Sequence, residues 1–203
     1  MDKWQVSVVI PVIRPEGAER CAAHLYLDSS FNNYEVIARE DKERIGCPKM
    51  IKKLVSLAKY DWVIFLGDDT VPQLGLMLRA LEKTMELPDN WGMVGLNDQY
   101  HDGNNLATHW MAHKKLLLLL DGEFFHTGYW HQFCDRELTL RCKELGRYVF
   151  AEKAILKHEH PIIDQSIKSD PDYNRVYGKE CYRHDLILFR RRERNGWVTP
   201  SSS

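Results

Sequence analysis

The strongest constraint on the fold is an alternation of apolar runs and helical stretches through the first 86 residues. Val6–Val12 is almost continuously apolar and β-branched, which is typical of a strand buried on both faces. Further strands are predicted at Tyr34–Arg39 and Asp61–Leu66. Helices are predicted after each strand, over Glu16–Asp28, from Pro48, and from Pro72 to about Glu86. This order predicts an α/β fold with an open, mostly parallel central sheet flanked by helices.

Each of these strands ends in a segment with polar or turn-forming residues. The three segments are Pro11–Arg14, Glu40-Asp41 and Asp68-Asp69. Ligands of open α/β sheets bind at the carboxyl ends of the strands. We therefore expect the three segments to lie along one edge and to form a binding site there.

The second half of the chain has a less regular pattern. Strands are predicted at Gly92–Leu96, Lys115–Leu120 and Arg147–Leu156, a polar loop at Asp98–Asn105, a helix at Asp135–Leu145, and an amphipathic piece near Asp185–Arg194. No internal repeat or linker divides the chain, so residues 1–198 are predicted to form one domain, with 199–203 as a disordered tail.

Composition excludes several classes of protein. A net charge of −1 and a pI near 6.8 argue against a surface that is wholly devoted to nucleic acid or membrane. The longest aliphatic run, Leu116–Leu120, is far shorter than the roughly 20 residues of a membrane span. No signal-peptide pattern is present, and the five cysteines are scattered and odd in number, as expected for reduced thiols. These features predict a cytoplasmic protein.

The adjacent carboxylates of Asp68 and Asp69 need compensation at the end of a buried strand. They repel each other, and burial disfavours their charged forms. A hard divalent cation shared with a diphosphate would compensate them, which points to Mg²⁺ or Mn²⁺. The alternative is that one of the two only caps the helix predicted near Pro72.

With these residues in view, the segments Val8–Val12, Glu40-Asp41 and Trp62–Asp69 resemble the nucleotide-binding half of a large family of GT-A glycosyltransferases. That family includes cellulose, chitin and hyaluronan synthases. The resemblance implies a donor-binding role for Pro11, Val12 and Arg14, which would line the nucleotide base, and for Glu40 or Asp41, which would bind its ring edge. It also implies that Asp68 contacts the ribose or sugar and that Asp69 ligates the metal. Gly67 stands where many members of the family have an acid.

The resemblance continues in Gly128–Arg141, which is similar to the acceptor-side segment of the family. Asp135 matches the catalytic base of an inverting transfer, and Glu137 is the fallback base. Cys134 stands where the family has a glutamate. The alternative for Asp135 is the N-cap of the following helix, a role that is compatible with catalysis.

His158 and His160 lie on the same side of an extended segment that follows the predicted strand Arg147–Leu156. By the resemblance, His158 is a metal ligand, with His160 as second candidate; the alternative is a solvated pair. Four further histidines fit no zinc spacing and are assigned to the acceptor cleft or the surface: His109, His113, His126 and His131.

Two groups of cations have more than one interpretation. Lys49 is assigned to the donor diphosphate, although it could lie on the solvated side of a helix. The cluster Arg190–Arg194 could bind an anionic membrane surface, nucleic acid or a donor phosphate, or it could complement the dipole at a helix C-terminus.

The resemblance therefore implies a metal-assisted glycosyltransferase that uses a nucleotide-diphosphate sugar, most simply a UDP-sugar, and a hydroxyl acceptor. Residues 1–97 would form the donor half, 98–161 the acceptor half, and 162–198 an extension. The acceptor could be a glycan, a lipid-linked molecule, a protein or modified nucleic acid, and a homo-oligomer is possible. The alternatives are a nucleotidyltransferase acting on a sugar phosphate and a non-catalytic nucleotide-sugar-binding module.

Overall fold

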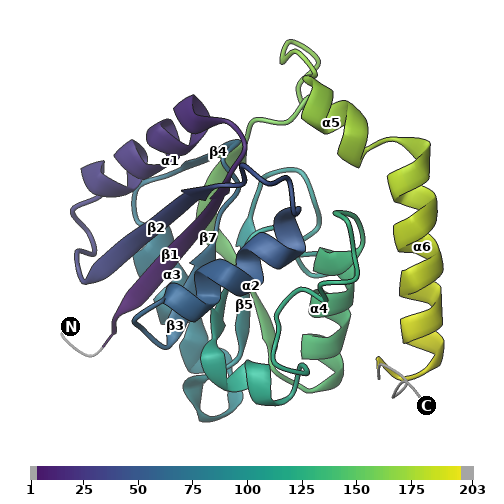
Figure 1. Ribbon diagram of the computed structural model, residues 1–203. Helices are drawn as coiled ribbons and strands as arrows, with labels where there is room; N and C mark the ends of the chain where they lie inside the picture. Colours follow the sequence, from purple (N-terminus) through teal and green to yellow (C-terminus); the bar gives the residue numbers. More distant parts are fainter. Residues whose placement is uncertain (1–3, 198–203) are drawn as a thin grey trace.

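The computed structural model describes residues 4–197 and has helices on both faces of one central sheet (Figure 1). The strands are β1 (Val6–Val12), β2 (Tyr34–Glu40), β3 (Trp62–Phe65), β4 (Thr70–Pro72), β5 (Met93–Asn97), β6 (Trp110–His113) and β7 (Tyr148–His158). The α-helices are α1 (Pro15–Leu27), α2 (Cys47–Leu57), α3 (Leu76–Lys83), α4 (Cys134–Glu144), α5 (Pro171–Val176) and α6 (Lys179–Arg194). Three short 3-10 helices are η1 (Thr84–Glu86), η2 (Pro88–Asn90) and η3 (Lys114–Leu118).

The sheet has seven strands in the order β2-β1-β3-β6-β5-β7-β4. β1 pairs in parallel with β2 and β3, and β5 pairs in parallel with β7. β6 is antiparallel to both of its neighbours, and β4 is antiparallel to β7. All strands except β4 and β6 therefore run the same way, which confirms the predicted α/β architecture with a mostly parallel sheet.

Successive side chains of β1 point to opposite faces of the sheet and enter two separate cores. Val8 and Ile10 pack in a cluster that includes side chains from α1 and α3. Val9 belongs to the other cluster, which contains residues of α2, α4 and α6. Burial on both faces explains why this strand is apolar along its length.

Two predicted elements are wrong. Pro72 does not open a helix: Thr70–Pro72 forms β4, and α3 begins only at Leu76 after Gly75 in the left-handed conformation (φ 82°). Proline is tolerated there because β4 is an edge strand. The predicted strand Lys115–Leu120 instead contains η3. Leu116 and Leu120 are buried while Leu118 is exposed, a helical spacing rather than the alternation of a strand.

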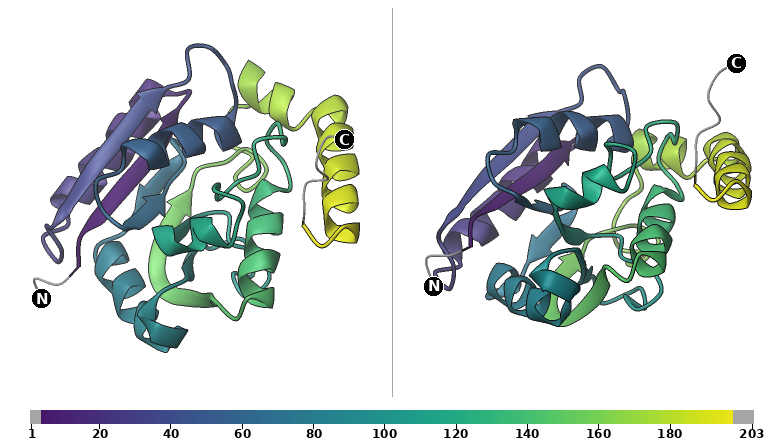
Figure 2. Two further views of the ribbon diagram at one scale, coloured as in Figure 1. Left: turned by 60° about the horizontal axis from the view of Figure 1, so that its bottom comes forward. Right: turned by 90° about the horizontal axis from the view of Figure 1, so that it is seen from below.

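The chain continues past β7 into α5 and then α6, which runs along the outer side of α4 (Figures 1 and 2). A buried ion pair joins these two helices, because Arg192 of α6 donates to both carboxylate oxygens of Glu137 in α4, at 2.7 and 2.8 Å. Among residues 4–197, no helix combines the length and the apolar character that a bilayer span requires. The predicted tail 199–203 lies outside the described residues.

Candidate functional site

Asp68 joins the ends of two neighbouring strands. Its Oδ2 accepts hydrogen bonds from the backbone amides of Ile13 and Arg14, both at 2.6 Å, and Arg14 Nη1 lies 3.0 Å from its Oδ1. The third predicted segment joins the same edge, because the Asp41 amide donates to Val12 O at 2.8 Å. The predicted convergence at the carboxyl edge of the sheet is therefore confirmed. Burial, followed by the charge of Asp69, raises the pKa of Asp68.

Asp69 points to different partners. Tyr173 Oη donates to its Oδ2 at 2.8 Å, and His158 Nε2 lies 3.6 Å from the same oxygen. Burial alone would raise the pKa of this carboxyl, but His158, His109 and Tyr173 together outweigh burial and hold the pKa well below its usual range. Neither acid caps a helix, since the N-cap of α3 is Gly75; the capping interpretation of the pair is wrong.

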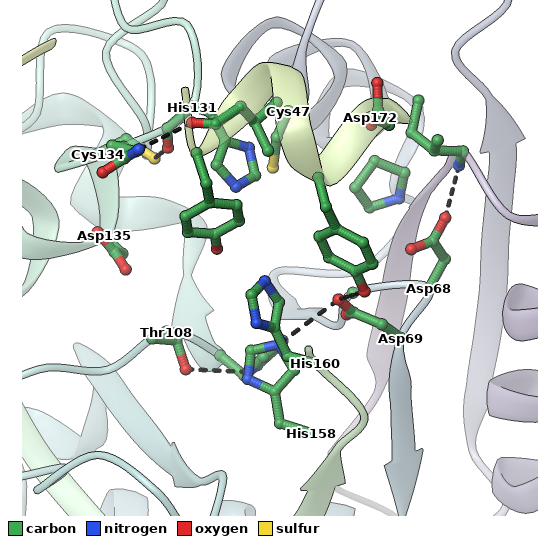
Figure 3. A pocket seen from close by; sticks show the side chains of 18 of the residues that line it. Cys47, Asp68, Asp69, Thr108, His131, Cys134, Asp135, His158, His160 and Asp172 are labelled. Atoms are coloured by element: carbon green, nitrogen blue, oxygen red, sulfur yellow. Dashed lines mark hydrogen bonds and ion pairs between the residues drawn. The ribbon is translucent and has the colours of Figure 1, made fainter. Parts of the chain in front are cut away.

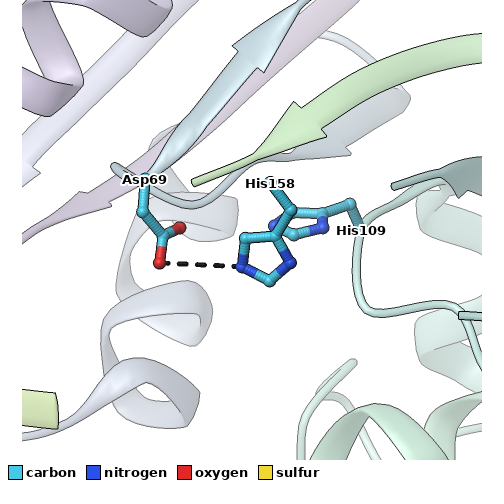
Figure 4. A group of neighbouring side chains, drawn as sticks. All are labelled: Asp69, His109 and His158. Carbon is cyan, nitrogen blue, oxygen red and sulfur yellow. Dashed lines mark ion pairs between the residues drawn. The ribbon is translucent and has the colours of Figure 1, made fainter. Parts of the chain in front are cut away.

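A third side chain, His109, completes a cluster with Asp69 and His158 (Figure 4). One carboxylate oxygen and one ring nitrogen from each histidine all lie within 4.8 Å of one another. Gly67 makes room for the cluster, because a Cβ at this position would come within 2.5 Å of Asp69 Oδ1 and 3.3 Å of His109 Nε2.

Strands β4 and β6 bring the two histidines to Asp69. Thr70 of β4 lies opposite His158 at the end of β7, and the Glu159 amide donates to Asp69 O at 2.7 Å. β6 runs antiparallel to β3 with Trp110 opposite Phe65. His109 precedes β6 and therefore lies at the carboxyl end of β3, where the acid loop begins.

The pKa values of the two histidines in the cluster shift in opposite directions. Burial lowers the pKa of His158, but the nearby carboxylates of Asp69 and Asp98, at 3.6 and 3.7 Å, outweigh burial and raise the pKa to about 9. Burial lowers the pKa of His109 to about 3, so this ring is neutral and can offer a lone pair. One carboxylate and two imidazoles form a donor set that suits a divalent transition metal. The residues therefore fit the metal that the sequence predicts.

A cavity of about 380 Å³ lies beside the cluster (Figure 3). Asp135 and Asp69 stand on opposite sides of it. Eight of the predicted site residues line it: Pro11, Arg14, Asp41, Asp68, Asp69, Asp135, His158 and His160. Residues predicted for the donor side and for the acceptor side therefore line the same cavity.

Four predicted residues do not line this cavity. Val12 is buried in the core, while Glu40 and Lys49 are exposed. Glu137, the fallback base, is 3% exposed and engaged by Arg192 and by Tyr129 Oη, which donates to its Oε2 at 2.7 Å. A carboxylate held in this way is a structural anchor between helices and does not face a reactant.

Two of the lining residues have additional partners. Asp41 accepts from the amides of Ile45 and Gly46, both at 2.9 Å, and so fixes the turn before α2. His160 Nδ1 accepts from the Ile162 amide at 3.1 Å, and its Nε2 is buried without a partner. His160 is not a member of the cluster of Asp69, His109 and His158.

Asp135 is the second residue of α4, whose N-cap is Phe133 with φ 65°. Its Oδ1 accepts from the Arg136 amide at 2.8 Å. The N-cap interpretation is therefore wrong. Burial raises the pKa of Asp135, although the Arg136 amide and the charge of His101 partly offset this.

Sequence reasoning missed Cys47 and Tyr173, which line the cavity, and it assigned His109 to the acceptor cleft or the surface and not to a metal cluster. The only signal for His109 was an excess of histidines without a zinc spacing. Tyr173 lies in α5, 104 residues from Asp69, and only the folded chain shows their contact. Its ring also lies 3.7 Å from the Arg14 guanidinium carbon.

No protein-family model matches the sequence, and no curated protein has a significant sequence match. Solved structures do resemble the fold. One is the mannosyltransferase PcManGT from Pyrobaculum calidifontis in complex with GDP-Man and Mn²⁺, at 12% identity and a TM-score of 0.61, over 92% of this chain and 70% of that one.

A second is S. aureus TarS 1-349 in complex with UDP-GlcNAc, at 14% identity and a TM-score of 0.60, over 85% of this chain and 64% of that one. Another TarS 1-349 structure has a TM-score of 0.59 at 14% identity, over 78% of this chain and 61% of that one. The chain thus spans less than two thirds of the matched TarS chains. At these identities the likeness shows that this chain shares the fold of those structures.

Proposed function

We propose that this chain is a metal-dependent glycosyltransferase that moves a sugar from a nucleotide-diphosphate donor to a hydroxyl acceptor. The observation that carries the proposal is the cluster of Asp69, His109 and His158 at the carboxyl edge of the sheet, in the wall of the cavity that Asp135 also lines. The fold shared with structures that hold GDP-Man or UDP-GlcNAc supports the same assignment.

On the donor side, we assign the nucleotide base to the part of the cavity near Pro11, Ile13 and Asp41. Asp68 shapes this part, because the amides of Ile13 and Arg14 and the guanidinium of Arg14 already occupy its oxygens. Asp69 has no backbone amide among its hydrogen-bond partners in the described residues, so it is the member of the acidic pair that we assign to the metal.

The donor set narrows the choice of metal between the two that the sequence predicts. Mg²⁺ prefers oxygen ligands and keeps several waters, whereas Mn²⁺ accepts imidazole more readily. Two histidines among three protein ligands therefore favour Mn²⁺ over Mg²⁺. When bound, the metal would offset negative charge on the departing nucleoside diphosphate.

On the acceptor side, Asp135 would accept the proton of the attacking hydroxyl. Its raised pKa makes it a stronger base than an ordinary aspartate, and it lies across the cavity from Asp69 (Figure 3). Attack from that side, opposite the leaving diphosphate, is the geometry of an inverting transfer.

A nucleotide-release assay tests the proposal with a panel of UDP-, GDP- and dTDP-sugars, each with Mn²⁺, with Mg²⁺ and with a chelator. We expect release from at least one donor with Mn²⁺, weaker release with Mg²⁺, and none with the chelator or with Asp69→Ala. Donor binding without release, across many acceptors, would instead indicate a non-catalytic binding module. No binding of any nucleotide sugar would refute the proposed function.

A further inference from the structure

A buried carboxylate outside the proposed metal ligands, Asp98, lies directly after β5 and is 4% exposed. Its Oδ1 accepts from the amides of Tyr100 and His101, at 3.0 and 2.8 Å. Its Oδ2 accepts from Thr108 Oγ1 at 2.8 Å and contacts His101 Nδ1 at 2.6 Å. Oδ1 therefore holds the loop that follows β5, and Oδ2 faces the cluster of Asp69, His109 and His158.

Asp98 acts on His109 through Thr108. A hydroxyl has one hydrogen, and Thr108 donates it to Asp98, because a carboxylate can only accept. The Thr108 oxygen can then only accept from His109 Nδ1, which lies 3.1 Å away. This places the ring proton of His109 on Nδ1 and leaves Nε2, the nitrogen that faces Gly67, with its lone pair free.

Asp98 acts on His158 directly. His158 Nδ1 lies 3.7 Å from Asp98 Oδ2 and is buried without a hydrogen-bond partner, while its Nε2 faces Asp69. Carboxylates therefore face both ring nitrogens of His158. A metal held by Asp69 would replace the proton on Nε2, while Asp98 would keep the other proton on Nδ1.

We infer that Asp98 is a positioning residue that sets the tautomers of both His109 and His158, so that each presents Nε2 to a metal held with Asp69. The inference rests on the metal site of the proposed function. By this inference one buried carboxylate orients two ligands that are far apart in the sequence, His109 just before β6 and His158 at the end of β7.

The test compares Mn²⁺ dissociation constants of the purified protein and three variants. Asp98→Asn replaces an acceptor by an amide that donates toward Thr108 and His158, so the constant should rise about 10- to 100-fold. Thr108→Val removes only the hydrogen bonds that link Asp98 to His109 through Thr108, and should raise the dissociation constant on the order of 10-fold or less. Asp102→Asn is the matched control. Asp102 lies in the same loop, and the hydrogen bonds described for its carboxylate are with Asn104 and Asn105, so the dissociation constant should not change.

A second readout needs no metal. Nitrogen-15 spectra of the histidine side chains in the metal-free protein should show the Nδ1–H tautomer at His109, and Thr108→Val should lose this preference. Thr108→Val leaves Asp98 in place and therefore keeps the test valid if Asp98→Asn does not fold.

The inference is overturned if folded Asp98→Asn and Thr108→Val bind Mn²⁺ as tightly as the wild type, or if His109 of the wild type carries its proton on Nε2. If the wild type binds Mn²⁺ and releases nucleotide while Asp98→Asn and Thr108→Val bind Mn²⁺ equally tightly, this inference alone is refuted. A wild type that binds no Mn²⁺ would remove the proposed metal site together with it.

Discussion

Gly67 stands where many members of the resembled family have an acid, and its surroundings give a steric reason for the glycine. A Cβ would come within 2.5 Å of Asp69 Oδ1, so any side chain here displaces the carboxylate that we assign to the metal. The glycine accompanies a proposed ligand set in which two histidines join one acid.

Gly67→Ala is therefore expected to weaken Mn²⁺ binding by about tenfold or more, as loss of ligand geometry does elsewhere. The unfolding free energy should change little, because the groups that a methyl would meet are the ends of two polar side chains. Mn²⁺ titration together with chemical denaturation measures both quantities. Gly122→Ala is the control: a Cβ there meets nothing within 4 Å, so metal affinity should stay the same despite its positive φ.

The raised pKa of Asp135 predicts a pH dependence. A general base must be ionised, and burial shifts the pKa of Asp135 upward from 3.8. The rate of transfer should therefore rise with pH through an acid limb that lies above the pKa of an ordinary aspartate. Asp135→Asn should lower kcat roughly 10²- to 10⁴-fold, the usual contribution of such a base. A variant that keeps wild-type kcat would show that another group accepts the proton.

At the scale of elements, two short strands, β4 and β6, limited how much of the fold could be predicted from the sequence. The strands β1 and β3 were predictable because their apolar runs are buried on both faces, whereas β2 is an edge strand in which only Ile37 is buried. β4 and β6 have three and four residues, too few to show a period. Their pairing with β7 and β3 is what brings His158 and His109 to Asp69.

The prediction of the site was limited by the same two strands. The resemblance supplied His158, whereas His109 depends on the antiparallel placement of β6 and had no signal in sequence spacing. Glu137 was misplaced because the sequence does not show that Arg192 of α6 packs against it. A helix position alone cannot distinguish a carboxylate that faces a cavity from one that faces another helix.

Removal of one partner from the pair of Glu137 and Arg192 should destabilise the fold. Both side chains are buried, and an uncompensated buried charge typically costs about 3–5 kcal/mol. Glu137→Gln should therefore lower the free energy of unfolding by an amount of this order, as measured by urea denaturation. Any enzyme that remains folded should keep most of its kcat. A stable Glu137→Gln protein without activity would restore Glu137 as a candidate base.

At the scale of the whole molecule, a segment distant in the sequence packs against the proposed donor site. Asp170 caps α5 and accepts from Arg14 Nε at 2.7 Å, and Tyr173 donates to Asp69. Asp170 and Tyr173 thus contact Arg14 and Asp69, which lie far from them in the sequence. The division into a donor half, an acceptor half and an extension stays a prediction, as do the acceptor, the sugar and the oligomeric state.

The central claim is that Asp69, His109 and His158 hold a divalent metal that a nucleotide-diphosphate sugar shares. Calorimetric titration of UDP- and GDP-sugars into the protein, with Mn²⁺ and with a chelator, tests it most directly. The account predicts that at least one donor binds with Mn²⁺, and that chelation or Asp69→Ala weakens this binding by an order of magnitude or more. Binding that is equally tight without the metal, or no binding of any donor, would contradict it.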